Sequence, residues 1–413
     1  MDFVSKICRG DQKIWMIFFL LLCLSIVAVF SASSTLTFNK NYWEPITKHV
    51  MFLLFGSAIV LFASSLKPKV FTLTLIGLPC AWALLIAVKA MGSSVNGAER
   101  YIFGFQPSEF AKFFLVGSVA FFLSRYKKTN REIFYKITVW ISIITCGFIF
   151  IDNFSTAVLI FGVIIMMLCI ARIPFKKLVK LIWWCGLFAG LFVVLTFVIP
   201  ENVWEKTPLN RAVTVKYRVG RFLHIIDIDE SSKKDANFQE LQAKIAIANS
   251  KFIGKGPGNG IGRNVLPQAF SDFIYAIIIE EYGMLGGIAV LGLYVWLFIQ
   301  AGLIARQCES LFPKLLVMGS ALMLTVQAMA NMAVAVGLIP VTGQPLPLLS
   351  KGGSSILVTC AFIGVILSVS HFNTLKGVKR DDEIGEEMAE QMQMSLAAEE
   401  ARTAENYSEF EEN

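Results

Sequence analysis

The sequence predicts an all-α polytopic membrane protein with about ten transmembrane helices and one large extracytoplasmic loop between the seventh and the eighth. Three observations predict this class. The chain is 55% hydrophobic and only 16% charged, whereas soluble proteins carry roughly 25% charged residues. Apolar runs of membrane-spanning length recur along its 413 residues. Clusters of Lys and Arg lie in alternate connections between these runs. An ordinary soluble enzyme is therefore excluded.

A bilayer core about 30 Å thick is crossed by about 20 helical residues. Runs of this length and character occupy ten stretches of the sequence, namely 14–33, 46–65, 70–90, 108–124, 134–151, 156–171, 181–199, 273–300, 315–336 and 352–370. A short polar break at 152–155 leaves two readings open, because 134–171 forms either two helices or one kinked helix.

Positive charges orient the predicted helices. Connections rich in Lys and Arg stay in the cytoplasm, so we predict a multi-pass membrane protein with both termini cytoplasmic. The loop on the opposite side, residues 200–272, is too long for its Lys and Arg content to determine its side of the membrane. Residues 1–372 are predicted as the transmembrane domain and 373–413 as a cytoplasmic tail. The basic clusters lie near the N-terminus and at 67–69, 125–131, 172–180, 306 and 376–380.

The C-terminal tail differs from the rest of the chain in charge. Residues 381–413 hold 12 Asp and Glu against one Arg, and the other 380 residues hold 36 Lys and Arg against 18 Asp and Glu. This basic excess flanks apolar runs, which indicates membrane orientation and no nucleic-acid partner. We interpret the tail as a solvated helix or a disordered segment. The eight cysteines lack metal-ligand spacing, so neither a disulfide framework nor a zinc site is predicted.

The first candidate site lies at the start of the fourth run. Glu109 and Lys112 are three residues apart, so they share a helix face and can pair inside the bilayer. Polar side chains at this depth are costly and therefore functional candidates, although a purely structural ion pair fits equally well. Arg100 lies just outside the run, where it can meet an anionic headgroup.

The large loop supplies the second group of candidates. Its glycine-rich stretch 254–262 does not match G-x-x-x-x-G-K-[ST], so it does not predict a nucleotide-binding P-loop. A merely solvated loop is one interpretation. The other is a substrate-binding loop, because cationic side chains suit the oxygens of a lipid-linked pyrophosphate. The candidate substrate-binding residues here are Arg218, Arg221, Gln239, Gln242, Lys255 and Arg263.

Asp272 is the last carboxylate before the eighth run and is predicted to lie where water meets lipid. A partly desolvated carboxylate at that boundary can act as a general base. Helix capping by Ser271, or by Asp272 itself, is the alternative. Glu280 and Glu281, deeper in the same run, are expected to find partners inside the helix bundle.

The stretch 337–355 carries three prolines and four glycines, which forbid a continuous helix. Irregular backbone near membrane depth persists only where it is buried in protein or lines a wet cavity. Ser354 and Ser355 open the tenth predicted helix, whose N-terminal dipole favours an anion. Both serines are therefore candidates for contact with a phosphate-bearing substrate.

These clusters, in this order on ten predicted helices, resemble the SEDS family of peptidoglycan polymerases, the FtsW/RodA family, over residues 12–372. The end of the first helix, at 31–34, favours the FtsW branch. The motifs that carry the resemblance are Gln106-Pro107-Ser108-Glu109 with Lys112, the run 256–262 leading to Leu266-Pro267 and Asp272-Phe273-Ile274, and Pro347-Leu348-Leu349-Ser350-Lys351-Gly352-Gly353-Ser354-Ser355.

The resemblance implies an inverting glycosyltransferase. It would join a polyprenyl-pyrophosphate-linked glycan to the 4-hydroxyl of Lipid II, with Asp272 as the essential acidic residue and Glu109 with Lys112 as a charged pair. It also implies a class B penicillin-binding protein, a transpeptidase, as partner, alongside other division or elongation proteins. No certain cofactor is predicted. A divalent cation, Mg or Mn, is a candidate to share the pyrophosphate charge with Arg100, Arg218, Arg221 and Arg263.

Three departures from the family pattern accompany the resemblance. The fifth-to-sixth connection reads Asp152-Asn153-Phe154, which moves the acidic side chain by one position. Lys351 stands where a Tyr is common, and Phe270 where a His is usual. An elongation-type polymerase and a lipid-precursor flippase or transporter stay open as alternatives. The candidate clusters concentrate towards the outer half of the predicted bundle, which favours an enzyme over a pathway that crosses the membrane.

Overall fold

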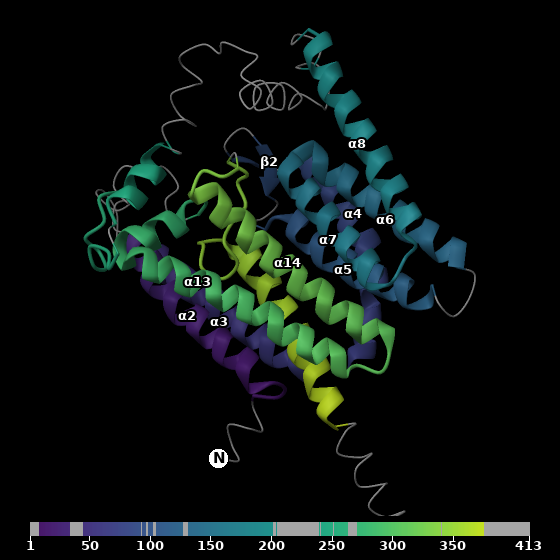
Figure 1. Cartoon of the computed structure of the whole chain (residues 1–413), viewed down its shortest axis with the longest axis horizontal. Coiled ribbons are helices and arrows are strands. Elements are labelled where there is room, and N and C mark those ends of the chain that lie inside the picture. The colour runs from purple at the N-terminus through teal and green to yellow at the C-terminus, as the bar shows by residue number, and fades with distance from the viewer. Residues whose placement is uncertain are drawn as a thin grey trace, which may run out of the picture.

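The computed structural model describes residues 8–33, 44–91, 93–95, 98–101, 105–126, 131–200, 204, 239, 241–250, 252–262, 271–339 and 341–375 (Figure 1). In this part of the chain nine helices are long and apolar enough to cross a membrane, and a tenth, Phe154–Ile170, is shorter. The predicted all-α, multi-pass membrane fold is confirmed. The elements are α2 (Gln12–Ser33), α3 (Glu44–Ser65), the 3-10 helix η1 (Pro68–Leu73), α4 (Thr74–Met91), β1 (Ser93–Val95), β2 (Ala98–Tyr101), α5 (Pro107–Arg125), α6 (Arg131–Asp152), α7 (Phe154–Ile170), α8 (Phe175–Val198), α13 (Ile274–Gln307), α14 (Leu311–Ala335) and the last helix, Gly353–Leu375.

The helices differ in how far they are enclosed by their neighbours. α14 packs against α5, α7 and α13, and it shares the centre of the bundle with the last helix. α8 lies at the periphery, where it exposes Trp183, Phe188 and Leu191. Large apolar side chains face lipid without penalty, so this pattern is typical of an outer transmembrane helix.

Residues 134–171 form two helices that fold back on each other. Asn153 alone separates α6 from α7, and its side chain accepts a hydrogen bond from the Thr156 backbone N–H at 3.3 Å, which caps α7. After α7 the chain has returned to the level where α6 began, because Lys177 pairs with Glu132 and the Tyr135 hydroxyl donates to the Lys177 carbonyl at 3.3 Å. The two-helix interpretation is therefore correct.

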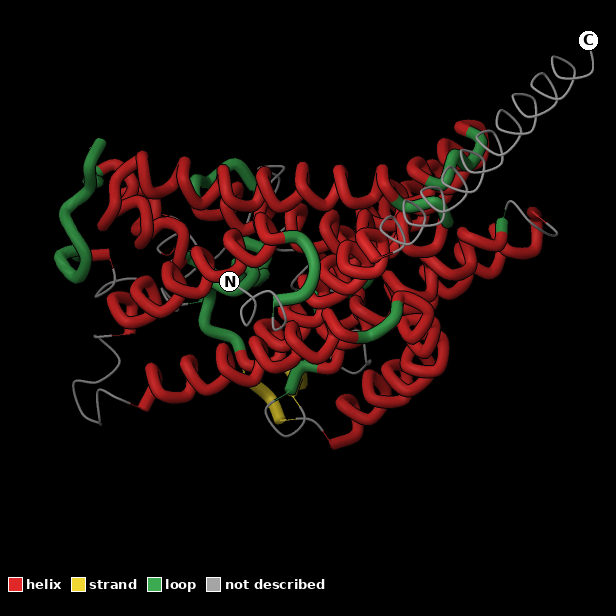
Figure 2. Tube along the Cα trace, turned by 90° about the horizontal axis from the view of Figure 1, so that it is seen from below, coloured by secondary structure: helices red, strands yellow, loops and turns green. Residues whose placement is uncertain are grey.

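One short strand pair interrupts the helical pattern. β1 and β2 pair antiparallel between α4 and α5, with Val95 opposite Ala98, and Figure 2 shows them in yellow at the edge of the helices. This pair was not predicted, since its seven residues carry no alternating apolar pattern.

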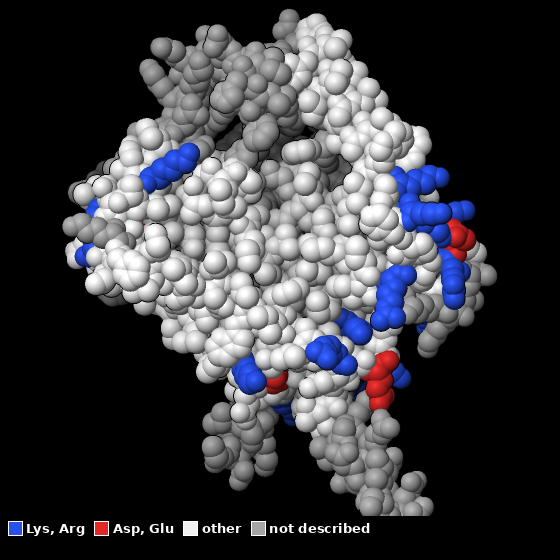
Figure 3. Space-filling view, viewed as in Figure 1, with Lys and Arg blue, Asp and Glu red and all other residues white. Residues whose placement is uncertain are grey.

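The two ends of the bundle differ in character. At one end, here named the basic end, most of the Lys and Arg side chains gather around the connections of α5, α6, α8, α13 and α14 (Figure 3). At the other, named the Asp272 end, lie the strand pair, the α6–α7 turn and the start of α13. The described chain ends at the basic end with Leu375. This segregation of cations matches the alternation in the sequence, and the predicted tail beyond residue 375 lies outside the described residues.

Candidate functional site

Asp272 lies directly before α13, half-buried at the end of the bundle. The N-cap residue of α13 is Phe273, and no side chain caps this helix. The Ser271 hydroxyl instead donates a hydrogen bond to Asp272 Oδ1 at 3.1 Å. The capping interpretation is therefore wrong for both Ser271 and Asp272, and the carboxylate is not used to start the helix.

Asn331 fixes the backbone beside this carboxylate. Its side-chain amide comes from α14 and donates to two backbone carbonyls at once, that of Asp272 at 2.9 Å and that of Gln344 at 2.8 Å. Asn331 is 1% exposed. One buried amide therefore joins the start of α13 to the segment 341–350, two parts of the chain that are distant in sequence. Asn331 is not among the site residues predicted from the sequence.

The segment 341–350 has no regular helix and is largely buried. Its carbonyls are satisfied by side chains from the surrounding helices, as buried backbone requires. Gln327 donates to the Pro345 carbonyl at 2.9 Å, Tyr294 donates to Pro347, and Ser25 donates to Leu348 at 2.6 Å. Of the two environments predicted for this segment, the structure shows burial within protein.

The Ser350 side chain and the backbone at Gly343 place this segment against Asp272. The Ser350 hydroxyl accepts from the Leu346 N–H at 2.7 Å and donates to the Ser271 carbonyl at 2.6 Å. Gly343 has a φ of +67°, and a Cβ added there would lie 3.8 Å from Asp272 Oδ2. Leu348 adopts a φ of +64° although it is not glycine. Non-glycine residues held at such positive φ values cluster at functional sites, because the surrounding structure must overcome the backbone strain.

Glu109 and Lys112 form the predicted ion pair on α5, with 2.7 Å between Lys112 Nζ and Glu109 Oε1. Lys112 is 1% exposed and also donates to Gln327 Oε1 at 3.1 Å. Gln327 in turn holds the Pro345 carbonyl. The pair is therefore connected through one side chain to the segment that faces Asp272. Its predicted contact with substrate stays a prediction.

The glycine-rich run encloses two carboxylates of the same chain. Glu280 accepts hydrogen bonds from Lys255 Nζ, from the Ile261 N–H and from the Gly262 N–H, each at 2.9 Å. Glu281 accepts from the Gly258 N–H at 3.1 Å. Both glutamates were expected to find partners inside the helix bundle. The partners of Glu280 instead come from the glycine-rich run, whereas Glu281 also accepts from the Ser31 hydroxyl of α2. Successive backbone N–H groups make an anion-binding concavity, and here the anions are side chains of α13.

Close approach of two backbones explains why this part of the chain needs glycine. Gly283 interrupts α13 with a φ of +73° and a ψ of −174°, a combination that is essentially restricted to glycine. A Cβ on Gly283 would collide with the Phe252 carbonyl, and one on Gly254 would collide with the Glu281 carbonyl. The glycine-rich run can therefore lie directly against the kink of α13.

The other predicted site residues are placed as follows. Ser354 and Ser355 are buried in the first turn of the last helix, and Ser354 Oγ accepts from the Gln106 N–H at 3.2 Å, which ties this helix to the start of α5. Arg100 lies in β2. Gln239 and Gln242 are half-buried in the loop. Three predicted residues lie outside the described part of the chain, namely Arg218, Arg221 and Arg263.

The fold and the site define a class: a multi-pass helical membrane protein in which buried polar side chains hold one carboxylate at the end of the bundle. Comparison with known proteins identifies the family. A family model described as "Cell cycle protein", covering FtsW, RodA and SpoVE, matches residues 11–375. The chain belongs to this family, which confirms the resemblance in the sequence.

Named relatives and solved structures agree with this assignment. "Probable peptidoglycan glycosyltransferase FtsW" of Coxiella burnetii is 31% identical over 372 residues, covering 85% of this chain and 93% of that one. Its counterpart in Saccharophagus degradans is 30% identical over 381 residues, covering 88% and 92%. A chain of a peptidoglycan synthase complex, described as coordinating polymerization and crosslinking, has 23% identity and a TM-score of 0.66, covering 88% and 98%. Rod shape determining protein RodA of Thermus thermophilus has 22% identity and a TM-score of 0.61, covering 88% and 97%.

Proposed function

We propose that this protein is a peptidoglycan glycosyltransferase that polymerises Lipid II, with Asp272 as the general base. The observation that carries the proposal is the way Asp272 is held. Asn331 and Ser350 donate to the backbone carbonyls of Asp272 and Ser271, and the Ser271 hydroxyl contacts Asp272 Oδ1. The Asp272 carboxylate does not cap α13. Both substrates are anchored by polyprenyl tails, so the reacting groups meet at the membrane surface, the depth expected for this carboxylate.

The proposed step is a direct displacement. Asp272 takes the proton from the 4-hydroxyl of the Lipid II acceptor, and the oxygen forms a bond to the anomeric carbon of the donor glycan. The bond from that carbon to the polyprenyl pyrophosphate breaks, and the pyrophosphate leaves with the electron pair. Attack from the opposite face inverts the anomeric centre. Arg100, Arg218, Arg221 and Arg263 are proposed to neutralise the leaving pyrophosphate.

A divalent cation would stabilise the same leaving group. Among the described residues, no three His, Cys, Asp or Glu side chains come together to hold a metal ion.

Three finer assignments belong to this proposal. The relatives named FtsW support a role in septal synthesis during division, although an elongation-type role is the alternative. A class B penicillin-binding protein is the proposed partner, since one structural neighbour is part of a synthase complex for polymerization and crosslinking. The cations at the basic end support an orientation with both termini in the cytoplasm, and the bacterial relatives support a location in the inner membrane.

Asp272→Asn tests the proposed base. The amide cannot accept the proton, so purified variant incubated with fluorescent Lipid II is expected to yield no glycan ladder on a gel while still binding Lipid II. Glu132→Gln, at an exposed acid on α6 of the basic end, is the matched control and is expected to polymerise at the parental rate. Ladders from Asp272→Asn at the parental rate would end the proposal.

A flippase is distinguished by a second measurement on the same preparation. Proteoliposomes with labelled Lipid II in one leaflet report transfer to the other leaflet. Transfer without glycan product would favour the transporter alternative, whereas glycan product without transfer supports the enzyme.

A further inference from the structure

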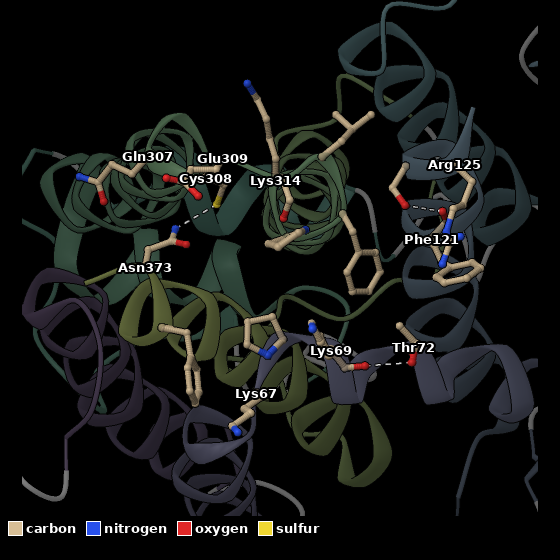
Figure 4. Close-up of a pocket in the computed structure, with 17 residues that line it drawn as sticks. Lys67, Lys69, Thr72, Phe121, Arg125, Gln307, Cys308, Glu309, Lys314 and Asn373 are labelled. Atoms are coloured by element: carbon tan, nitrogen blue, oxygen red, sulfur yellow. Dashed lines mark hydrogen bonds between the residues drawn. The ribbon is translucent and has the colours of Figure 1, made fainter. Parts of the chain in front are cut away.

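A cavity of about 1340 Å³ opens at the basic end of the bundle, whereas Asp272 lies at the opposite end. Figure 4 shows the side chains that line this cavity. Its walls come from Lys67 and η1, the end of α5, the α13–α14 connection with the start of α14, and the end of the last helix. Four cationic side chains line it, and Glu309 is the acidic residue in its lining. The cations are Lys67, Lys69, Arg125 and Lys314.

The positive charge of this cavity is largely unneutralised. In the described part of the chain, no carboxylate lies within ion-pair distance of Lys67, Lys69 or Lys314. Arg125 lies over the Phe121 ring, 5.2 Å from its centroid. Aromatic surface is supplied by Phe121 together with Phe312 and Phe372. Cationic and aromatic side chains in the lining of one cavity suit an anionic ligand that also carries apolar groups.

We propose that this cavity binds the chain's own acidic C-terminal segment, residues 381–413. The charges are complementary, since the segment carries 12 Asp and Glu against one Arg. The path is short, because Phe372 and Asn373 line the cavity and the last helix ends at Leu375. The six residues from there to Asp381 span at most about 20 Å. The cavity and the beginning of the segment therefore lie at the same end of the bundle, whichever orientation the protein has in the membrane.

The C-terminal segment also carries apolar side chains that could pack against the aromatic side chains of the cavity. Met388, Met392 and Leu396 are spaced by four residues, so they would share one face if the segment is helical. An amphipathic helix that lays its apolar face in a groove is a common mode of recognition. Covalent attachment raises the effective concentration of such a segment to about the millimolar range, so a modest affinity suffices. The proposal does not depend on glycosyltransferase activity.

Binding in trans tests the proposal. Residues 1–380 are placed in nanodiscs of zwitterionic phosphatidylcholine, and a fluorescent peptide of residues 381–413 is titrated by anisotropy. The peptide is expected to bind, and the affinity to fall steeply between 50 and 500 mM salt because the contacts are ionic. A peptide with every Asp and Glu changed to Asn and Gln is expected not to bind. Both comparisons use one preparation of residues 1–380 with unaltered cavity residues, so the difference between the two peptides does not depend on a substitution in the cavity.

Charge reversal locates the site. Lys67→Glu, Lys69→Glu and Lys314→Glu combined are expected to weaken peptide binding by about tenfold or more, since three attractions become repulsions. The matched control reverses three exposed lysines of α6 and α8 at the same end, Lys136→Glu, Lys176→Glu and Lys180→Glu, with an effect expected within about twofold.

Three outcomes would overturn the proposal. They are absence of peptide binding, equal binding by the cavity variant, and equal binding of the neutral peptide. Nanodiscs that contain phosphatidylglycerol distinguish another source of anions. If the cavity retains this lipid in a lysine-dependent way while the peptide does not bind, the site recognises headgroups and the tail assignment is wrong.

Discussion

At the scale of single residues, Asn331 fixes the backbone carbonyl of Asp272. Its amide donates to the Asp272 and Gln344 carbonyls. Asn331→Ala leaves both buried carbonyls without that donor, at a cost of about 1–3 kcal/mol for each unsatisfied group. A small displacement of a catalytic group costs up to about a hundredfold in rate. We therefore expect kcat for Lipid II polymerisation to fall roughly 10- to 100-fold with KM nearly unchanged.

Thr325→Val is the matched control for Asn331→Ala. Thr325 lies on the same helix, and its buried hydroxyl makes no hydrogen bond. Its removal is expected to be neutral or slightly stabilising. Steady-state polymerisation and thermal unfolding are measured on both variants. An Asn331→Ala enzyme with the parental kcat, or one whose KM alone rises, would contradict a positioning role.

The Glu109–Lys112 pair gives the second prediction at this scale. Both side chains are nearly inaccessible to solvent, at 6% and 1% exposed. Removing one partner leaves an uncompensated buried charge, so Glu109→Gln and Lys112→Met are each expected to lower the free energy of unfolding by about 3–5 kcal/mol. The double variant carries no charge there and should recover much of this loss.

A double-mutant cycle on thermal unfolding measures the coupling between the two positions. The control pair is Glu132 and Lys177, which also form an ion pair but are exposed by 64% and 28%. Exposed pairs contribute little, so the same cycle there should give a coupling near zero. Additive losses at Glu109 and Lys112 would show that the pair does not stabilise the bundle as a unit.

At the scale of elements, the kink of α13 is predicted to depend on Gly283. Its backbone conformation is closed to residues with a Cβ, and the Phe252 carbonyl occupies the space that a methyl group would need. Gly283→Ala is therefore expected to lower the stability by about 3 kcal/mol or more. Gly292→Ala lies in the same helix with open space around it, and it should be neutral or stabilise by up to about 1 kcal/mol. Equal unfolding temperatures for the two variants would contradict this account.

The elements also show which parts of the fold the sequence could predict. Helix positions follow from apolar runs, since a membrane fixes both length and composition. The α6–α7 hairpin could not be predicted from the sequence, because the same apolar pattern fits two helices or one bent helix. Tertiary packing of α6 against α7 decides between them, and the contact of Lys177 with Glu132 reports the outcome. For the glycine-rich run, the sequence indicated cationic side chains that could bind a pyrophosphate, but not that its backbone N–H groups bind Glu280 and Glu281.

At the scale of the whole molecule, the candidate site is assembled from parts that sequence order keeps separate. Asp272, Asn331 and the segment 341–350 come from one third of the chain, whereas Lys112 reaches them through Gln327 from α5. Sequence reasoning named Asp272, Glu109 and Lys112 from their charge at membrane depth. Neutral side chains that only hold backbone, such as Asn331, carry no such signal, because their role exists only once the helices pack.

The basic end predicts the orientation of the whole molecule. Lys and Arg are retained on the cytoplasmic side because translocating them is costly, so residues 171–174, between α7 and α8, should be cytoplasmic and the end of α8 at Val198 extracytoplasmic. Alkaline phosphatase, which is active only outside the cytoplasm, is expected to be active when fused after residue 200 and inactive when fused after residue 174. These two fusions differ by one helix and control for expression. A fluorescent protein fused after residue 413 should fluoresce, since it matures in the cytoplasm. Phosphatase activity at residue 174 with none at residue 200 would invert the bundle and move Asp272 to the cytoplasmic face, where the proposed acceptor hydroxyl could not reach it.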